Sequence, residues 1–179
     1  GVDIFAFEPH PENLALLREN VSRNSASSVT VVPCAVSDHP GEQDLFVYGG
    51  ANAGRHSLLP INEGGKIRIT TVTLDEFWAE QKLGDRIPRF IKIDIEGYEL
   101  VALRGAPEVL SRCPTVLFEF SPQFMNKAGL APAELLDLMY GMGFECTQVD
   151  EGRKAPVTRE FLLSGDHQVN LLWQRAERT

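Results

Sequence analysis

The sequence predicts an α/β fold built on a mostly parallel sheet, with an antiparallel strand at its C-terminal end. Short apolar runs alternate with segments of helical periodicity, the connections between them are short, and acidic residues follow several of the runs. A strand that passes through a helix into the next strand usually pairs with it in parallel, so this alternation favours right-handed strand–helix–strand units. The 179 residues are sized for a single domain over 1–179.

The first such unit lies in the N-terminal part of the chain. Val2–Phe7 is an apolar run stopped by an acid and a proline, which is typical of a buried strand. A helix is expected to begin at Pro11, and residues 29–33 predict the next strand. The helix carries an apolar stripe at helical spacing: Leu14, Leu17 and Val21.

The rest of the chain continues the alternation. A loop rich in Gly and Asn, residues 49–57, separates two of the expected strands. Pro107 is expected to divide one helical segment into two short pieces that end by Arg112. The closing run, 169–173, is expected to pair antiparallel with the strand before it. Strands are predicted at 43–48, 66–73, 89–95, 115–120 and 144–149, and helices at 75–81, with Thr73 as a possible N-cap, and 133–142.

Composition excludes several function classes. The formal net charge is −8, whereas proteins that bind the nucleic-acid backbone usually carry a basic excess, so no nucleic-acid partner is expected. No apolar run approaches the roughly 20 residues of a membrane-spanning helix, so no membrane insertion is expected. The three cysteines, Cys34, Cys113 and Cys146, form no zinc or disulfide pattern. They are interpreted as small hydrophobic residues of a protein in the reducing cytoplasm.

Acidic residues follow the predicted strands, where ligands bind in open α/β sheets: Glu8, Asp38, Asp94, Glu96 and Glu119. Glu8 could accept hydrogen bonds from a ribose diol, or could equally be an acid favoured by the dipole of the Pro11 helix. Asp38 could accept from an exocyclic amine such as that of adenine, or could serve only the turn before Pro40.

Two arrangements are open for the acids near residue 95. If the strand runs through Glu96, Asp94 and Glu96 lie on one face; otherwise Glu96 and Glu99 occupy the first turn of the next helix. With Glu119 on the neighbouring strand, Asp94 and Glu96 could bind a divalent cation, although carboxylates alone do not establish a metal site. His56, in the Gly/Asn-rich loop, is a candidate general base because imidazole titrates near neutral pH.

Taken together, these segments resemble the FkbM-type S-adenosylmethionine-dependent methyltransferases. The resemblance begins at Phe7-Glu-Pro-His-Pro-Glu-Asn13 and continues through Ala35-Val-Ser-Asp38 and Thr73-Leu-Asp-Glu-Phe77. It is strongest at Phe90-Ile-Lys-Ile-Asp-Ile-Glu-Gly-Tyr-Glu99, followed by Leu117-Phe-Glu-Phe120. The motifs occur in order over roughly Ile4 to Val149. The resemblance implies a Rossmann-like sheet of the class I methyltransferase kind, with helices on both faces.

The resemblance also implies roles for individual residues. It places Glu8, followed by Pro9, at the ribose diol of S-adenosylmethionine. It places Asp38, with Ala35 and Val36, on the adenine side, and Asp94 near the methionine end and the transferred methyl group. It does not select a base, so Asp94, Glu96, Glu119 and His56 all remain catalytic candidates.

The N-terminal motif of the family has no counterpart in this sequence. Members normally begin with a first strand and a glycine-containing loop that wraps the cofactor, and this strand lies mid-sheet, between the second and the fourth. We therefore expect the chain to be N-terminally truncated, with a first strand that precedes Gly1.

The expected function is the S-adenosylmethionine-dependent methylation of a hydroxyl oxygen. The family implies a small-molecule or glycan acceptor: a sugar, a glycolipid or a polyketide-type natural product. One alternative is a methyltransferase-like domain that binds or scaffolds without catalysis. Another is a nicotinamide-dependent oxidoreductase, which the absence of a GxGxxG motif disfavours. The sequence does not predict the oligomeric state.

Overall fold

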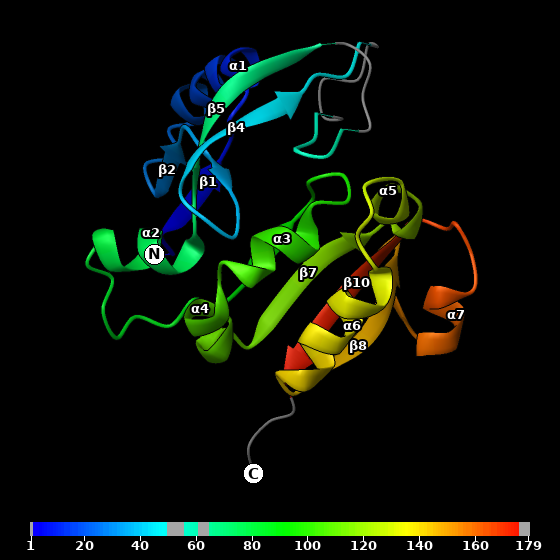
Figure 1. Cartoon of the computed structure of the whole chain (residues 1–179). Coiled ribbons are helices and arrows are strands. Elements are labelled where there is room, and N and C mark those ends of the chain that lie inside the picture. Colours follow the sequence, from blue (N-terminus) through cyan, green and yellow to red (C-terminus); the bar gives the residue numbers. More distant parts are fainter. Residues whose placement is uncertain (1, 50–55, 61–64, 176–179) are drawn as a thin grey trace.

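The computed structural model describes residues 2–49, 56–60 and 65–175 of the chain. Its strands and helices alternate along the sequence, which confirms the α/β class (Figure 1). The described strands form three separate sheets.

The N-terminal unit is the predicted strand, helix and strand. β1 (Ile4–Phe7) and β2 (Val29–Val32) pair in parallel, with Ile4 opposite Val29. Between them, α1 (Pro11–Arg23) begins with a proline whose missing N–H costs nothing at that position. Its apolar stripe is half-buried or less, and no residue of α1 is fully buried. This layer is therefore only lightly packed.

A small second sheet follows, in the order β3-β5-β4. β3 (Ala35–Val36) is parallel to β5 (Lys66–Val72), and β4 (Gly41–Phe46) is antiparallel to β5. The sequence predicted two of these strands to within two residues, but not that they would leave the main sheet. Their buried apolar cluster is small: Ala35, Leu45 and Ile69.

The main sheet has five strands in the order β6-β7-β10-β8-β9. The last strand, β10 (Val169–Arg175), lies antiparallel between β7 (Thr115–Phe120) and β8 (Phe144–Asp150), which confirms the expected antiparallel C-terminal strand. β6 (Ile91–Ile93) is parallel to β7. β9 (Arg153–Pro156) forms a hairpin with β8 that the sequence did not reveal, because its residues are all exposed and show no apolar alternation.

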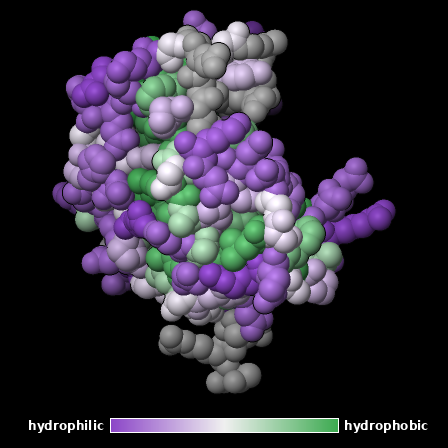
Figure 2. Space-filling model, turned by 45° about the vertical axis from the view of Figure 1, so that its right-hand side comes forward, coloured by the Kyte–Doolittle hydropathy of each residue, from purple (hydrophilic) through white to green (hydrophobic). Residues whose placement is uncertain are grey.

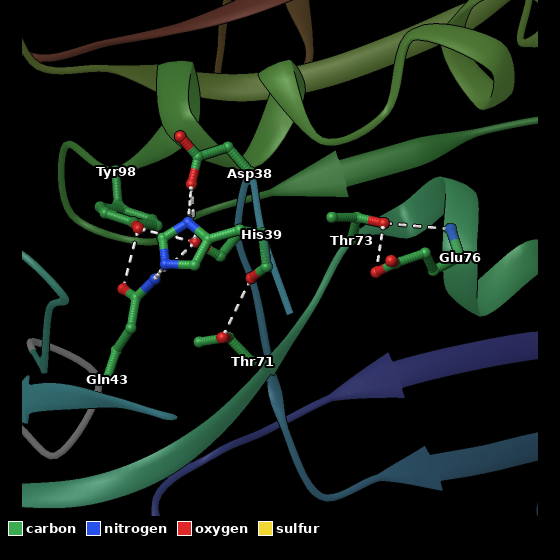
Figure 3. Close-up of polar contacts among 8 residues, drawn as sticks. Asp38, His39, Gln43, Thr71, Thr73, Glu76 and Tyr98 are labelled. Atoms are coloured by element: carbon green, nitrogen blue, oxygen red, sulfur yellow. Dashed lines mark hydrogen bonds and ion pairs between the residues drawn. The ribbon is translucent and has the colours of Figure 1, made fainter. Parts of the chain in front are cut away.

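In the described part of the chain, all helices but one begin at either a threonine cap or a proline. Thr73 caps α2 (Leu74–Glu80): its hydroxyl oxygen accepts the Glu76 N–H at 3.0 Å and donates to the Glu76 carboxylate, as Figure 3 shows. Pro107 restarts the chain after α3 (Glu99–Arg104), as predicted. Prolines begin α4 (Pro107–Arg112), α5 (Pro122–Lys127) and α6 (Pro132–Gly141). The last helix is α7 (Arg159–Leu163).

The core lies between the five-stranded sheet and α3, α4 and α6, which cover the face seen in front in Figure 1. Alternate residues of β7 are buried, and Phe118 stacks on Trp173 with ring centroids 5.6 Å apart. The next residues of these strands, such as Leu117 and Leu172, are half-buried on the opposite face. In Figure 2 most of the surface is hydrophilic, interrupted by apolar areas across its middle.

The division into three sheets differs from the single sheet that the sequence suggests. Among the described residues, β1 pairs only with β2, and β6 pairs only with β7 at the edge of the main sheet. Within these residues, the β1–β2 pair is therefore not hydrogen-bonded to β6. Ile4 of β1 and Phe90, just before β6, are about half exposed. That a first strand precedes Gly1 stays a prediction.

The α3–α4 junction brings two backbones unusually close. A Cβ atom on Gly105 would lie 2.1 Å from the carbonyl oxygen of Ser37, in the turn after β3. Only glycine allows this approach, so the junction fixes the three-stranded sheet against the main core.

Candidate functional site

Glu8 lies at the carboxyl end of β1, where the sequence placed it. Its backbone N–H donates to the Val32 carbonyl at 3.1 Å, which fixes it to the end of the neighbouring strand. The carboxylate Oε1 accepts the His10 N–H at 2.8 Å, and the residue is half-buried with Pro9 beside it. Burial raises the pKa of Glu8, while the His10 hydrogen bond acts in the opposite direction.

Two histidines stack beside this turn. The rings of His10 and His56 lie 4.2 Å apart between centroids, with a tilt of 33°. His10 is buried, and its Nδ1 has no partner among the described residues. The Nδ1 atom of His56 accepts the Tyr48 N–H at 3.0 Å. Sequence reasoning selected His56 as a candidate and did not select His10, although His10 lies beside the Glu8 turn and directly precedes the first helix.

The Tyr48 contact bears on the role of His56 as a base. A neutral ring that accepts at Nδ1 carries its proton on Nε2, so both ring nitrogens are committed. Burial, and then the neighbouring His10, lower the pKa of His56, which keeps the ring neutral. His56 could accept a proton only after giving up the Tyr48 hydrogen bond.

Asp38 belongs to a polar network between the small sheet and α3 (Figure 3). Its Oδ1 contacts His39 Nδ1 at 2.5 Å, and the Gln43 amide lies 3.0 Å from the other ring nitrogen of His39. The Gln43 amide also donates to the Ser37 hydroxyl, which lies 2.8 Å from the hydroxyl of Tyr98. The Tyr98 hydroxyl in turn donates to Gln43 Oε1 at 3.0 Å. The network joins the turn after β3 to the start of α3.

The other adenine-side candidates lie in the strand just before this turn. Ala35 is buried and Val36 is half-buried, and they pair with Thr71 and Val72 of β5. Asp38 itself is exposed, and its Oδ2 has no partner among the described residues. One oxygen of this carboxylate is thus held by the fold while the other is open to a ligand.

Asp94 and Glu96 lie in the turn between β6 and α3. The strand ends at Ile93, so it does not carry both acids on one face. Asp94 forms an exposed ion pair with Lys92, at 2.9 Å between Nζ and Oδ2. Glu96 lies outside the helix with φ of +55°, and its carbonyl accepts the Ser57 hydroxyl at 3.2 Å. Of the two acids expected in the first helical turn, only Glu99 is there.

The Glu119 carboxylate is hydrogen-bonded to residues outside the β6–α3 turn. It lies near the end of β7, half-buried, and its Oε2 accepts from Gln168 at 2.5 Å and from Ser121 at 3.4 Å. In the described part of the chain, no three His, Cys, Asp or Glu side chains are placed to hold a metal ion.

Glu99, near the start of α3, has an environment that the sequence did not predict. It is 0% exposed, and its Oε1 accepts the N–H groups of Ile95 at 3.1 Å and Gly97 at 3.4 Å. Burial is the main cause that raises its pKa, to about 7. An acid in a first helical turn is usually exposed, so the available signal was its position just before the apolar Leu100 and Leu103.

Comparison with known proteins identifies the family. The family model for the methyltransferase FkbM domain matches residues 1–146. The chain belongs to the FkbM methyltransferase family. Hexuronic acid methyltransferase AglP of Haloferax volcanii is 28% identical to this FkbM chain over 139 residues, which are 76% of the chain and 52% of AglP. The chain therefore spans about half the length of this curated relative.

A solved structure shows the same fold. The crystal structure of methyltransferase FkbM from Methylobacillus flagellatus KT superposes with a TM-score of 0.55 at 20% identity, over 96% of this chain and 36% of that one. The α/β class and its methyltransferase-like form are thereby confirmed.

Two further features of the FkbM chain concern its cysteines and its helices. Each of the three cysteines is a free thiol, and burial raises the pKa of all three, to about 11 for Cys34 and about 12 for Cys146. Within the described ranges, no helix has the length and apolar character needed to cross a membrane.

Proposed function

We propose that this FkbM domain transfers a methyl group from S-adenosylmethionine to a hydroxyl oxygen of a sugar or glycan. The observation that carries the proposal is the half-buried Glu8 carboxylate at the carboxyl end of β1, next to a buried His10 nitrogen that has no partner within the described part of the chain. Ligands of open α/β sheets bind at this edge.

The chemistry of the described residues fits the donor. An ionised carboxylate offers about four acceptor positions, so Glu8 can accept from a ribose diol while it keeps its hydrogen bonds from the His10 N–H and the Asn13 side chain. The open Oδ2 of Asp38 suits the adenine amine, with Ala35 and Val36 as apolar neighbours. When bound, S-adenosylmethionine supplies a positively charged sulfonium whose methyl group is transferred.

The residues of the chain would contribute mainly by orientation. Holding an acceptor oxygen in line with the transferred methyl group can lower a barrier by about 7–11 kcal/mol. Asp94, at the end of β6, is proposed to lie at the methionine end, and a nearby base could add about 10²- to 10⁴-fold. Asp94, Glu96, Glu119 and His56 remain the candidates for that base.

The hexuronic acid relative supports a carbohydrate acceptor. AglP is described as a hexuronic acid methyltransferase, and we extend that acceptor class to this chain. A panel of hexuronic acid and neutral hexose glycans, incubated with the full-length protein and the donor, should gain one methylene in mass. The gain should survive mild alkali, which removes a methyl ester from a carboxylate but leaves a methyl ether on a hydroxyl. If neither class of sugar is methylated, the proposed acceptor is wrong.

The donor site is tested by calorimetry with S-adenosylhomocysteine on the full-length protein. Glu8→Ala should weaken binding by about 10- to 100-fold, because hydrogen bonds to a charged group contribute about 1.5–3 kcal/mol. Glu19→Ala, an exposed acid on α1, is the matched control and should leave the dissociation constant unchanged.

The outcomes of this experiment separate the rival functions. No heat from the wild-type protein would reject the donor and favour the non-catalytic scaffold. An unchanged dissociation constant for Glu8→Ala would remove Glu8 from the ribose position.

A further inference from the structure

The turn between β6 and α3, residues 94–98, has a strained backbone. Glu96 has φ of +55° and Gly97 has φ of +93°, so two successive residues are left-handed. Side chains other than glycine avoid this region, and a Cβ at Gly97 would lie 2.8 Å from the Cβ of Phe124. Such a turn persists only where its surroundings hold it.

Glu99 holds this turn from within. Its Oε1 accepts the N–H groups of Ile95 and Gly97, on either side of the left-handed Glu96. From the other side, the Ser57 hydroxyl donates to the Glu96 carbonyl. Because the N–H groups of Ile95 and Gly97 converge on one oxygen, the turn forms a small concavity that an internal carboxylate fills.

The burial of Glu99 indicates that this contact is specific. The side chain is 0% exposed, and its second oxygen, Oε2, has no partner among the described residues. Of the charged groups on β7, α4 and α6, which pack against α3, Glu119 on β7 is the one that acts on the Glu99 carboxylate. Glu134 of α6 is instead paired with Arg104 at the far end of α3. Burying a carboxylate costs free energy, and the hydrogen bonds of Glu99 to the turn offset part of that cost.

We propose that Glu99 is a positioning residue whose buried carboxylate holds the β6–α3 turn and thereby sets where Asp94 and Glu96 lie during methyl transfer. This inference rests on the proposed function for its catalytic consequence. Asp94 is the first residue after β6, and Glu96 is the turn residue that Glu99 brackets. Glu99 acts through these residues and does not touch the substrate.

The test combines amide exchange with kinetics on the full-length protein. In Glu99→Ala, exchange at the Ile95 and Gly97 amides should rise at least about 10-fold, while the amides of β7 stay protected. The turnover number should fall by about 100-fold with little change in KM, because a misplaced group costs rate more than binding. Glu99→Gln keeps an acceptor oxygen but not the charge, so its turnover should lie above that of the alanine variant and near the value of the wild type at low pH.

Titration gives a second readout that a merely structural role would not change. The ionised carboxylate accepts hydrogen bonds more strongly than the acid does, so wild-type turnover should rise with pH through about 7. Glu99→Gln should lack this rise. Glu160→Gln, an exposed acid in the first turn of α7, is the matched control and should retain it.

Several results would overturn the inference. Wild-type exchange rates at Ile95 and Gly97 in Glu99→Ala, or a wild-type pH profile in Glu99→Gln, would each do so. If the alanine variant does not fold, the amide shift of Gly97 in the wild-type protein still has to titrate near pH 7. These amide measurements use no donor, so failure to bind S-adenosylhomocysteine would reject the proposed function separately.

Discussion

The five-stranded sheet packs a continuous apolar core against its helices, whereas the three-stranded sheet buries few apolar side chains. Leu103, Phe118, Leu171 and Trp173 of the main core are all 0% exposed. The smaller sheet buries Ala35, Leu45 and Ile69 and is joined to α3 by the network of Ser37, Gln43 and Tyr98. The comparison shows a scaffold stabilised by apolar burial beside a site region held by polar contacts.

The same substitution in both regions gives the largest expected effect. Leu171→Ala in the main core should cost about 4 kcal/mol of unfolding free energy, because dense neighbours cannot fill the cavity. Leu45→Ala in the small sheet should cost about 2 kcal/mol, since its thinner surroundings can relax. Urea denaturation at constant m-value measures both. Equal losses would contradict the distinction between the two regions.

Glu99 follows Tyr98, the N-cap residue of α3 that contacts the small sheet, and its ionisation should make stability depend on pH. Its folded pKa of about 7 exceeds the ordinary 4.5, so the folded state binds the proton more tightly. That stabilisation is complete below pH 4.5 and is lost as pH rises through 7. At about 1.4 kcal/mol per pH unit, the loss amounts to about 3 kcal/mol.

Denaturation of Glu99→Gln and wild type at several pH values measures this loss. The variant lacks the titrating proton, so the difference in unfolding free energy should shift in its favour by about 3 kcal/mol between pH 4.5 and about 8. A difference that does not vary with pH would show that Glu99 is not buried as an acid in solution.

The smallest effect concerns the polar network. Tyr98→Phe removes the hydroxyl that contacts Ser37 and Gln43, and should cost about 1–2 kcal/mol. Tyr140→Phe is the control, because Tyr140 packs its ring on Trp173 and is partly exposed; its change should stay within about 0.5 kcal/mol. Similar losses in the two variants would mean that the network adds nothing to stability.

Local signals predicted the elements that depend on local chemistry. The Thr73 cap, the break at Pro107 and the antiparallel β10 were all predictable, because caps, prolines and apolar runs act within a few residues. The short α5 and α7 and the exposed β9 were not, since they have too few apolar residues to show a period.

The arrangement of the site depended on long-range contacts that a sequence pattern does not contain. The positions of Glu8 and Asp38 after their strands could be predicted because strand ends are visible in sequence. The commitment of His56 Nδ1 to the Tyr48 N–H, and the burial of Glu99 beneath its turn, arise from folding of distant segments. The separation of β3, β4 and β5 from the main sheet is likewise a tertiary effect.

The contact between Gly105 and the Ser37 carbonyl has a consequence for how this protein can vary. Real Cβ atoms essentially never come within 3.0 Å of a neighbour, so even one added methyl group, at 2.1 Å, would force the main chains apart. The atoms nearest to Gly105 are backbone atoms, so no side chain can move aside to make room for a larger residue. Substitutions can change the surfaces on either side of this contact, but position 105 itself can be occupied only by glycine.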